Sequence, residues 1–359
     1  MINYLKHIPK IFIKRNALPL YLTYFVTHKC NLKCRHCFFW KEINKNTKEL
    51  TLDEINKLSK TMNNIVHLNL TGGEPFLRND LSEIVNIFYK NNSLQNIAIP
   101  TNGFLTKQIL KIVKQILENC PNLAVMISLS LDGLKEQHDK IRGVKGSFNN
   151  AMKTYKELSK LRNKYKNLNL EIILSFSSFT QEYIQELYSF AKSLNPNSID
   201  VAFIRGNPRD KKAKSININN YIKICNQIEK DLSSKELIGY TNFSLSSLSS
   251  AVKTLKRKII AKTYKENKFQ TRCFAGNLSA VIYSNGDVFP CELLNKKIGN
   301  IRNYNYNFKA LWLSKNARDI RNYIKKTKCF CTHECNLTTN ILFNPKYIPY
   351  LITKSIKLK

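Results

Sequence analysis

The sequence is poor in acidic residues and has no long hydrophobic run. Its 359 residues include 25 aspartates and glutamates against 58 lysines and arginines, which gives a formal net charge of +33. No stretch of 18 or more residues is uniformly apolar, so we expect no membrane-spanning segment. The first ten residues mix charged and apolar side chains and lack the continuous apolar core of a signal peptide. These absences predict a cytoplasmic protein.

The ten cysteines point to a metal site. In a chain without an export signal, cysteines indicate metal ligation in a reducing compartment and not a disulfide framework. Cys30, Cys34 and Cys37 are spaced C-x3-C-x2-C. Three thiolates from one tight loop suit a [4Fe–4S] cluster whose fourth iron stays open to another ligand. The alternative is a zinc site closed by His36, although structural zinc sites usually use C-x2–4-C spacings.

Strand and helix patterns alternate between residues 21 and 232. Thr51 and Glu54 predict a capping box at the start of the first helix. The predicted strands comprise residues 21–27, 68–71, 97–100, 124–131, 170–176 and 199–204. The later predicted helices comprise residues 81–90, 107–118, 148–164, 183–194 and 221–232. Such alternation is typical of parallel βα units, and six units are too few to close an eight-stranded barrel.

The second strand ends in the turn Gly72-Gly73-Glu74-Pro75. Paired glycines allow a ligand close to the backbone, and Glu74 offers an acceptor to a cationic amine. Together with the three-cysteine loop, this turn makes the chain resemble the radical S-adenosylmethionine (SAM) superfamily. The resemblance implies that the open iron chelates the methionine moiety of SAM and that residues 72–75 run along it. It also implies an α/β fold, a partial (β/α)6 TIM-like barrel with its site at the carboxyl ends of the strands.

The ends of later strands supply further candidate contacts to SAM. The resemblance places Ser130 near the ribose and carboxylate of SAM, whereas Asn102 and Asp132 are also ordinary turn formers beside glycine. Arg142 is expected to pair with a carboxylate of SAM or substrate, or to lie on the surface. The predicted SAM-binding residues are Gly72, Gly73, Glu74, Pro75, Asn102, Ser130, Asp132 and Arg142. The catalytic base is unknown, and Glu292 is one candidate proton acceptor.

A second group of cysteines surrounds a predicted hairpin. The Asn285-Gly286 pair between apolar runs predicts a hairpin over residues 280–291. The cysteines of this group are Cys273, Cys291, Cys329, Cys331 and Cys335. The region resembles the auxiliary-cluster (SPASM or twitch) domains of radical SAM enzymes, but it has fewer cysteines after the hairpin. We therefore expect one auxiliary [4Fe–4S] cluster on four of the five. A zinc knuckle that uses His333 is the alternative.

Two cysteines have no partner nearby in the sequence. Cys120 and Cys225 lie on helical patterns, and we predict that both are buried small hydrophobic residues.

The resemblance implies a radical SAM enzyme, an oxidoreductase or transferase. Such an enzyme cleaves SAM reductively to a 5′-deoxyadenosyl radical and modifies its substrate by hydrogen abstraction. Relatives with such C-terminal domains often modify peptides, so we expect a peptide or protein substrate, although about 20 residues before the first strand leave no room for a leader-binding domain. A lipid, sugar or nucleotide-linked metabolite is the alternative. The implied partner is a low-potential electron donor, ferredoxin or flavodoxin.

A zinc-stabilised nucleic-acid-binding protein is the alternative of a different class. The high positive charge permits it. The lysines, however, are spread over the predicted helices, and the sequence contains no recognisable nucleic-acid-binding module, so we do not expect nucleic acid as a partner. The oligomeric state is not predicted.

The sequence divides into five predicted parts. These are a basic N-terminal extension (1–20), the barrel (21–235), a linker and helix (236–268), the auxiliary-cluster domain (269–340) and a basic C-terminal tail (341–359). Both ends mix isoleucine and leucine with lysine. Such ends can lie on an anionic bilayer, at about 1 kcal/mol per well-placed cation, which would place the protein at the inner face of the membrane. The alternative is that both ends pack against the rest of the protein.

Overall fold

Six parallel strands form the first part of one curved sheet. The computed structural model describes residues 18–237 and 246–358. The strands are β1 (Tyr21–Thr27), β2 (His67–Gly72), β3 (Asn96–Thr101), β4 (Ala124–Ser130), β5 (Leu168–Phe176) and β6 (Ser198–Phe203). Each pairs in parallel with the next one in the chain. The six predicted strands and the partial barrel are therefore confirmed.

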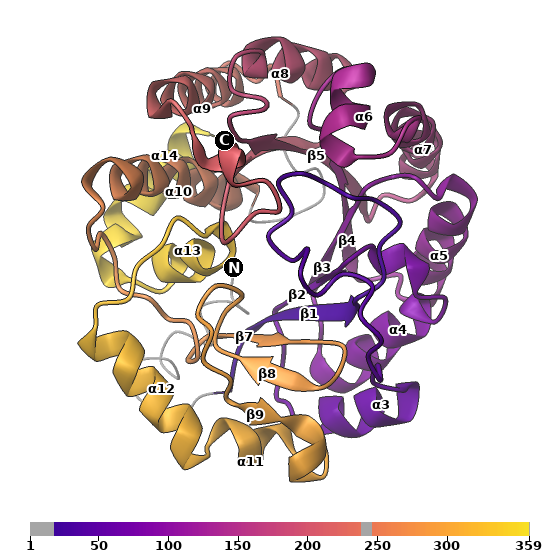
Figure 1. The fold of residues 1–359 in the computed structure, drawn as a ribbon, viewed down its shortest axis with the longest axis vertical. Helices are drawn as coiled ribbons and strands as arrows, with labels where there is room; N and C mark the ends of the chain where they lie inside the picture. The colour runs from indigo at the N-terminus through magenta and orange to yellow at the C-terminus, as the bar shows by residue number, and fades with distance from the viewer. Residues whose placement is uncertain (1–17, 238–245, 359) are drawn as a thin grey trace.

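Helices join successive strands and cover the outside of the barrel (Figure 1). They are α3 (Leu52–Lys60), α4 (Leu81–Asn92), α5 (Thr106–Asn119), α6 (Glu136–Arg142), α7 (Ser147–Lys164), α8 (Ile184–Ser193) and α9 (Ile218–Ser233), with short 3-10 turns η1 (Pro75–Leu77) and η2 (Lys211–Lys214). The capping box predicted at α3 is present, because the Thr51 and Glu54 side chains each accept a hydrogen bond from the other's backbone N–H. The short helix α6 had no counterpart among the predicted elements.

The predicted hairpin forms, and it extends the barrel sheet. β7 (Ser279–Ile282) pairs in parallel with β1, with Ser279 opposite Tyr21. β8 (Asp287–Phe289) and β9 (Gly299–Asn300) follow in antiparallel pairing, which gives the order β6-β5-β4-β3-β2-β1-β7-β8-β9. The helices that follow are η3 (Ile301–Tyr304), α11 (Phe308–Trp312), α12 (Lys315–Lys326) and α13 (Glu334–Leu342). Backbone hydrogen bonds between β7 and β1 thus connect the C-terminal region to the barrel sheet.

The helix α10 (Ser246–Glu266) packs beside β6, the strand at one edge of the sheet. Asp200 of β6 pairs with Lys256 at 3.0 Å and with Arg257 at 2.9 Å, and all three side chains are buried. Charges buried in this way are stable only when they are paired, so α10 is held in register with β6. The stretch predicted as a linker and helix, residues 236–268, contains the helix from Ser246 to Glu266.

The C-terminal stretch is a packed helix and not a free tail. After η4 (Pro345–Tyr347), α14 (Ile348–Lys357) packs along α10 and buries Leu351. Its outer side exposes Ile348, Ile352 and Ile356, which are 42%, 57% and 66% exposed. Most of the predicted N-terminal extension, residues 1–17, lies outside the described residues. A search of the described helices found none with the length and apolar character needed to cross a bilayer.

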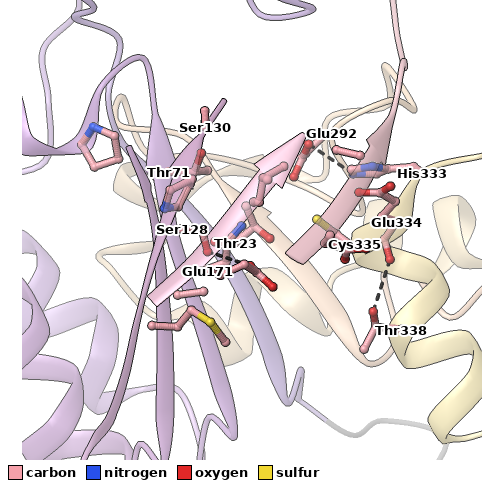
Figure 2. Close-up of a pocket in the computed structure, with 18 of the residues that line it drawn as sticks. Thr23, Thr71, Ser128, Ser130, Glu171, Glu292, His333, Glu334, Cys335 and Thr338 are labelled. Atoms are coloured by element: carbon pink, nitrogen blue, oxygen red, sulfur yellow. Dashed lines mark hydrogen bonds and ion pairs between the residues drawn. The ribbon is translucent and has the colours of Figure 1, made fainter. Parts of the chain in front are cut away.

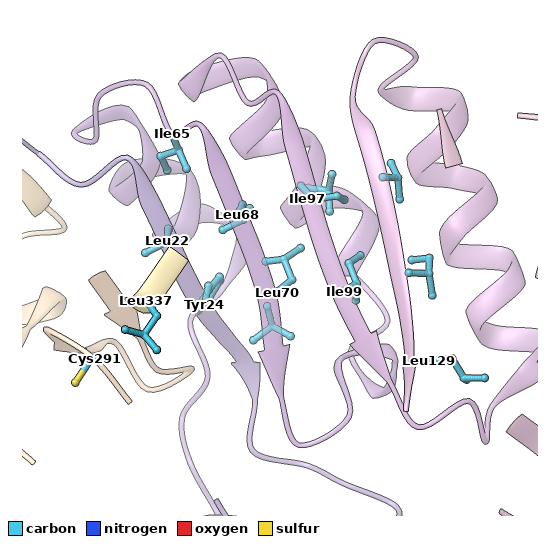
Figure 3. Close-up of a cluster of buried hydrophobic side chains, with 14 of the residues drawn as sticks. Leu22, Tyr24, Ile65, Leu68, Leu70, Ile97, Ile99, Leu129, Cys291 and Leu337 are labelled. Carbon is cyan, nitrogen blue, oxygen red and sulfur yellow. The ribbon is translucent and has the colours of Figure 1, made fainter. Parts of the chain in front are cut away.

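The two faces of the sheet differ in polarity. Figure 3 shows Leu68 and Leu70 of β2 with Ile97 and Ile99 of β3 in the apolar core. Successive side chains of a strand point to opposite faces, so the residues between them face the barrel interior. There the sequence places polar side chains such as Asn69, and these line a cavity where a closed core would otherwise form.

Candidate functional site

The loop after β1, which carries Cys30, Cys34 and Cys37, is anchored on two sides. Lys33 N donates to the carbonyl of Arg142 at 3.0 Å, which docks the loop on the end of α6. On the other side, Asp210 N donates to the carbonyl of Arg35 at 2.8 Å, and the Arg35 guanidinium pairs with the Asp210 carboxylate at 2.7 Å. The loop is therefore fixed to the segments that follow β4 and β6.

The three thiols of this loop line one cavity and are not joined by disulfides. Burial raises the pKa of Cys30 to about 12 and that of Cys37 to about 11. Arg142 Nη1 lies 3.7 Å from Cys34 Sγ and supplies a positive charge beside it. Buried thiols of this kind become thiolates only when a cation compensates their charge, so their chemistry fits a metal cluster.

The three cysteines of this loop are not as compact as a zinc site. Tetrahedral zinc with ligands at 2.0–2.3 Å holds its donor atoms roughly 3.3–3.8 Å apart. Within the part of the chain that the structure describes, three donor atoms all within 4.8 Å of one another occur only at Glu292, His333 and Cys335. Cys30, Cys34 and Cys37 do not form such a group, with or without His36, which argues against the zinc alternative for this loop.

Gly72 and Gly73 are needed because β2 runs against the cysteine loop. A Cβ atom on Gly73 would lie 2.1 Å from the carbonyl oxygen of Lys29, and one on Gly72 would lie 2.3 Å from that of Thr27. Gly72 also has a φ of +142°, which side chains rarely adopt. We had expected the glycines to make room for a ligand. In the structure they make room for the chain's own backbone, and this contact fixes the turn against Cys30.

Glu74 is buried behind the same turn. Thr101 Oγ1 and Asn102 N, at the end of β3, both donate to its carboxylate at 2.8 Å. Burial raises the pKa of Glu74 to about 7, although these hydrogen bonds favour its ionised form. The Asn102 side chain in turn donates to Asn31 Oδ1 at 2.8 Å. Glu74 and Asn102 therefore tie the ends of β2 and β3 to the cysteine loop.

Asp132 is a buried partner of Arg142 and does not line the cavity. Its Oδ2 lies 2.6 Å from Arg142 Nε and 3.7 Å from His36 Nε2. Burial alone would raise the pKa of Asp132, but the nearby Arg142, His36 and His138 and a hydrogen bond from Ser175 together lower it to about 2. The structure gives Asp132 a contact with Arg142 and no place in the cavity lining, and its direct contact with SAM stays a prediction. Arg142 is buried, so a surface position for it is wrong, and its pairing with a carboxylate of SAM or substrate stays a prediction.

A cavity of about 540 Å³ lies at the carboxyl ends of the strands and continues into the barrel. The predicted residues that line it are Cys30, Cys34, Cys37, Gly72, Gly73, Glu74, Pro75, Asn102, Ser130 and Arg142. Figure 2 shows Thr71, Ser128 and Ser130 on one side of it and Glu292, His333 and Cys335 on the other. The cavity thus brings most of the predicted site together.

A charged group deeper in the barrel escaped the sequence analysis. Glu171 of β5 accepts a hydrogen bond from Ser128 Oγ at 2.8 Å and pairs with Lys253 of α10. The signal for it was a polar residue at alternate positions of an otherwise apolar strand, seen at Asn169 and Glu171. Lys253 could not be linked to them from sequence, because α10 is about 80 residues away in the chain.

A second, smaller cavity of about 200 Å³ lies beside the hairpin. Four cysteines line it: Cys273, Cys291, Cys329 and Cys331. Cys335 lines the barrel cavity instead. Four unpaired thiols around one chamber fit an iron–sulfur cluster with a complete set of protein ligands.

The two remaining cysteines pack against hydrophobic neighbours, but only Cys120 is buried as predicted, because Cys225 is half-buried. Cys120, at the end of α5, is fully buried, and Cys225 of α9 packs against the same core.

Comparison with known proteins identifies two regions. Residues 24–191 match the model of the radical SAM superfamily, and residues 273–336 match SPASM, an iron–sulfur cluster-binding domain. These two domains imply a SAM-binding [4Fe–4S] cluster, SAM itself and an auxiliary iron–sulfur cluster.

Individual relatives agree with these matches. The chain is 27% identical to the subtilosin biosynthesis protein AlbA of Bacillus subtilis over 80% of its own length, but spans only 59% of AlbA. It is 26% identical to the AdoMet-dependent heme synthase of Methanosarcina barkeri, over 82% of each protein. Streptococcus suis SuiB, solved with its precursor peptide SuiA, has the same fold, with a TM-score of 0.60 and 18% identity over 89% of this chain and 71% of SuiB. The chain belongs to the radical SAM superfamily and carries a SPASM domain.

Proposed function

We propose that this enzyme cleaves SAM reductively at a cluster held by Cys30, Cys34 and Cys37 and modifies a peptide by hydrogen abstraction. The observation that carries the proposal is the shared cavity, which places these three thiols beside the Gly72–Pro75 turn. When bound, the cluster supplies the electron that splits SAM into methionine and a 5′-deoxyadenosyl radical.

The chain's own residues hold and shield this centre. Arg142 stabilises the charge of the Cys34 thiolate, and Asp132 fixes the Arg142 guanidinium from behind. Glu74 and Asn102 hold the β3 end against the loop, and with Ser130 they form the wall along which SAM would lie. When SAM and substrate fill the cavity, they would displace water from beside the thiols, which protects a radical from side reactions.

The size of the cavity favours a peptide substrate. A volume of about 540 Å³ falls within the range of roughly 300–1,000 Å³ that a single drug-sized ligand occupies, and SAM is such a ligand. Little room remains for a second molecule of that size, but one amino-acid side chain would fit. AlbA is named for biosynthesis of a bacteriocin, and SuiB binds a precursor peptide, which supports the same conclusion. A lipid, sugar or nucleotide-linked metabolite is the competing substrate class.

The electron donor that we propose is a low-potential ferredoxin or flavodoxin. The described part of the chain offers cysteines for the two clusters, and the electron for SAM must come from outside the protein.

The outer side of α14 supports a second proposal, contact with an anionic membrane surface. Ile348, Ile352 and Ile356 form an exposed apolar stripe on this helix, and the exposed Lys357 lies beside it in the sequence, whereas Lys354 pairs with Glu229. A basic amphipathic helix of this kind can lie in a lipid headgroup layer.

SAM cleavage tests the main proposal directly. Anaerobically purified protein with dithionite should convert SAM to 5′-deoxyadenosine and methionine. The triple variant with Cys30, Cys34 and Cys37 replaced by Ala should lose this activity and about four irons per chain, and should keep the remaining cluster absorbance. Cys225→Ala is the matched control and should keep both. Continued 5′-deoxyadenosine formation in the triple variant would refute the proposed cluster ligands.

Isotope transfer separates the substrate classes. The enzyme is incubated with SAM and either the peptide fraction or the small-metabolite fraction of fully deuterated cells of its source organism. Because the radical takes its hydrogen from the substrate, deuterium in 5′-deoxyadenosine from the peptide fraction supports a peptide substrate. Deuterium transferred from the metabolite fraction alone contradicts it.

A further inference from the structure

We propose that Glu292, His333 and Cys335 form an additional metal site, for a single divalent ion of the zinc type, in the wall of the barrel cavity. The site is separate from both iron–sulfur clusters and goes beyond the proposed function.

Cys335 stands apart from the four cysteines of the auxiliary chamber. Cys273, Cys291, Cys329 and Cys331 line the small cavity beside the hairpin, and they are sufficient for a [4Fe–4S] cluster with one thiolate per iron. Cys335 lies in the first turn of α13 and lines the barrel cavity. The charged groups that act on its thiol are Glu292, Arg205, Glu334 and Lys256. Figure 2 shows it on the same side of the cavity as Glu292 and His333.

The three donor atoms are close together and buried. Glu292 Oε2 lies 3.1 Å from His333 Nε2, and all three ligand atoms lie within 4.8 Å of one another. The side chains of Glu292 and His333 are 3% and 1% exposed. This spacing is close to that of the donor atoms in a tetrahedral zinc site, roughly 3.3–3.8 Å.

One polar atom of this group has no partner, and two others are partnered only by each other. Among the residues described, His333 Nδ1 has no hydrogen-bond partner, while His333 Nε2 and Glu292 Oε2 form an ion pair at 3.1 Å whose geometry does not meet that of a hydrogen bond. Burying a polar group without a partner costs about 1–3 kcal/mol, so native proteins rarely leave one unsatisfied. A metal ion bound between these atoms would satisfy Glu292 Oε2 and one nitrogen of His333 at once.

The charges and the donor types fit a divalent, borderline-soft ion. The Glu292 carboxylate and a Cys335 thiolate carry two negative charges, and carboxylate, imidazole and thiolate are all zinc ligands. Arg205 Nη2 lies 3.8 Å from Glu292 Oε2, which offers the competing arrangement, an Arg205–Glu292–His333 ion group without metal. Three protein ligands with a fourth position open to a cavity are typical of zinc sites that bind a water or a substrate atom. The open position would take an oxygen, nitrogen or sulfur donor of a molecule in the cavity.

Metal analysis of the holoenzyme tests the site. Anaerobic protein with its clusters in place is incubated with about two equivalents of zinc, passed over a chelating resin and analysed for iron and zinc. We expect one retained zinc per chain, and an X-ray absorption spectrum at the zinc edge with one sulfur and otherwise nitrogen or oxygen ligands. Cys335→Ser and Glu292→Gln should each lose the zinc and keep the iron. Cys331→Ser should lose about four irons, and Cys225→Ala should lose neither metal.

Two results would overturn the proposal. If Cys335→Ser loses as much iron as Cys331→Ser, Cys335 is a cluster ligand. If the wild-type protein retains no zinc, the group is the ion network with Arg205. Should Cys335→Ser fail to fold, Glu292→Gln and His333→Asn provide the same comparison of zinc against iron. Failure of the wild-type enzyme to cleave SAM would contradict the proposed function and leave the zinc measurement unaffected.

Discussion

At the scale of single residues, Arg142 carries an unusual number of contacts. Its carbonyl accepts from Lys33 in the cysteine loop, and its guanidinium lies beside Cys34 and pairs with Asp132 at 2.6 Å. The side chain is 8% exposed and that of Asp132 is fully buried. Removing one member of such a pair leaves an uncompensated buried charge, which costs far more than the loss of a surface ion pair.

The variant Asp132→Asn should therefore destabilise the protein by about 3 kcal/mol, because the Arg142 charge is left buried without its counter-ion. Anaerobic urea unfolding measures this change. The matched control is Asp53→Asn, which breaks the exposed pair with Lys57 and should change stability by less than about 0.5 kcal/mol. Equal effects of the two substitutions would show that the Asp132–Arg142 pair is not important for stability.

At the scale of elements, the start of α3 connects the barrel to the C-terminal region. Glu54 caps this helix, and its carboxylate also accepts from Arg302 Nε at 2.7 Å and from Tyr306 Oη at 2.8 Å. The hydrogen bond from Arg302 is the largest cause that lowers the pKa of Glu54, to about 2. The Glu54 carboxylate thus caps the start of α3 and joins this helix to the segment that contains Arg302 and Tyr306.

The lowered pKa of Glu54 predicts a pH-dependent contribution to stability. A depressed pKa stabilises the folded state above the unfolded value of about 4.5, and this contribution is lost as the pH falls towards 2. Glu54→Gln should lower the free energy of unfolding by about 2 kcal/mol at pH 7, and the difference from the wild type should shrink below about pH 4. Unfolding curves at several pH values test this, with the exposed Glu136→Gln as control. A difference that stays constant down to pH 3 would contradict the assignment.

The exposed stripe on α14 predicts binding to anionic vesicles at low salt. Replacing Ile352 and Ile356 together by Glu should reduce co-sedimentation with phosphatidylserine vesicles at least tenfold, because it removes apolar area and reverses the local charge. Tyr323→Glu, at an exposed aromatic position on α12, is the control and should have little effect. Absence of wild-type binding at low salt removes the membrane proposal.

At the scale of the whole molecule, the pairing of β7 with β1 makes the barrel and the SPASM region one sheet. Deleting residues 269–359 should expose the edge of β1 and the apolar side chains that the C-terminal region covers. We expect such a truncated protein to aggregate, as measured by soluble yield and by size-exclusion chromatography. A soluble, monomeric fragment 1–268 that retains about four irons would show that the predicted barrel folds independently.

Local patterns were enough to predict the barrel, and long-range contacts were not visible in the sequence. The alternation of apolar and polar residues fixed the six strands, and the spacing of Cys30, Cys34 and Cys37 indicated their common loop. The parallel pairing of β7 with β1 joins residues more than 250 positions apart and follows no local rule. Asp132 and Arg142 are only ten residues apart, but the sequence did not indicate that they pair, because the short helix α6 that carries Arg142 was not predicted. Nor did the sequence indicate that Cys335 lies away from the other four cysteines.

The pairing of β1 with β7 also has a consequence for the rate of electron transfer between the two cluster sites. The loop with Cys30 follows β1, and Cys291 follows the hairpin that starts with β7. Each cysteine group is therefore attached to strands that are neighbours in one sheet. Bending at a domain boundary should not change the separation of the two groups, because β1 and β7 are joined directly by backbone hydrogen bonds. Any electron passed between them therefore crosses a gap of constant length, and its rate should not depend on solvent viscosity, as it would if a closing motion had to come first.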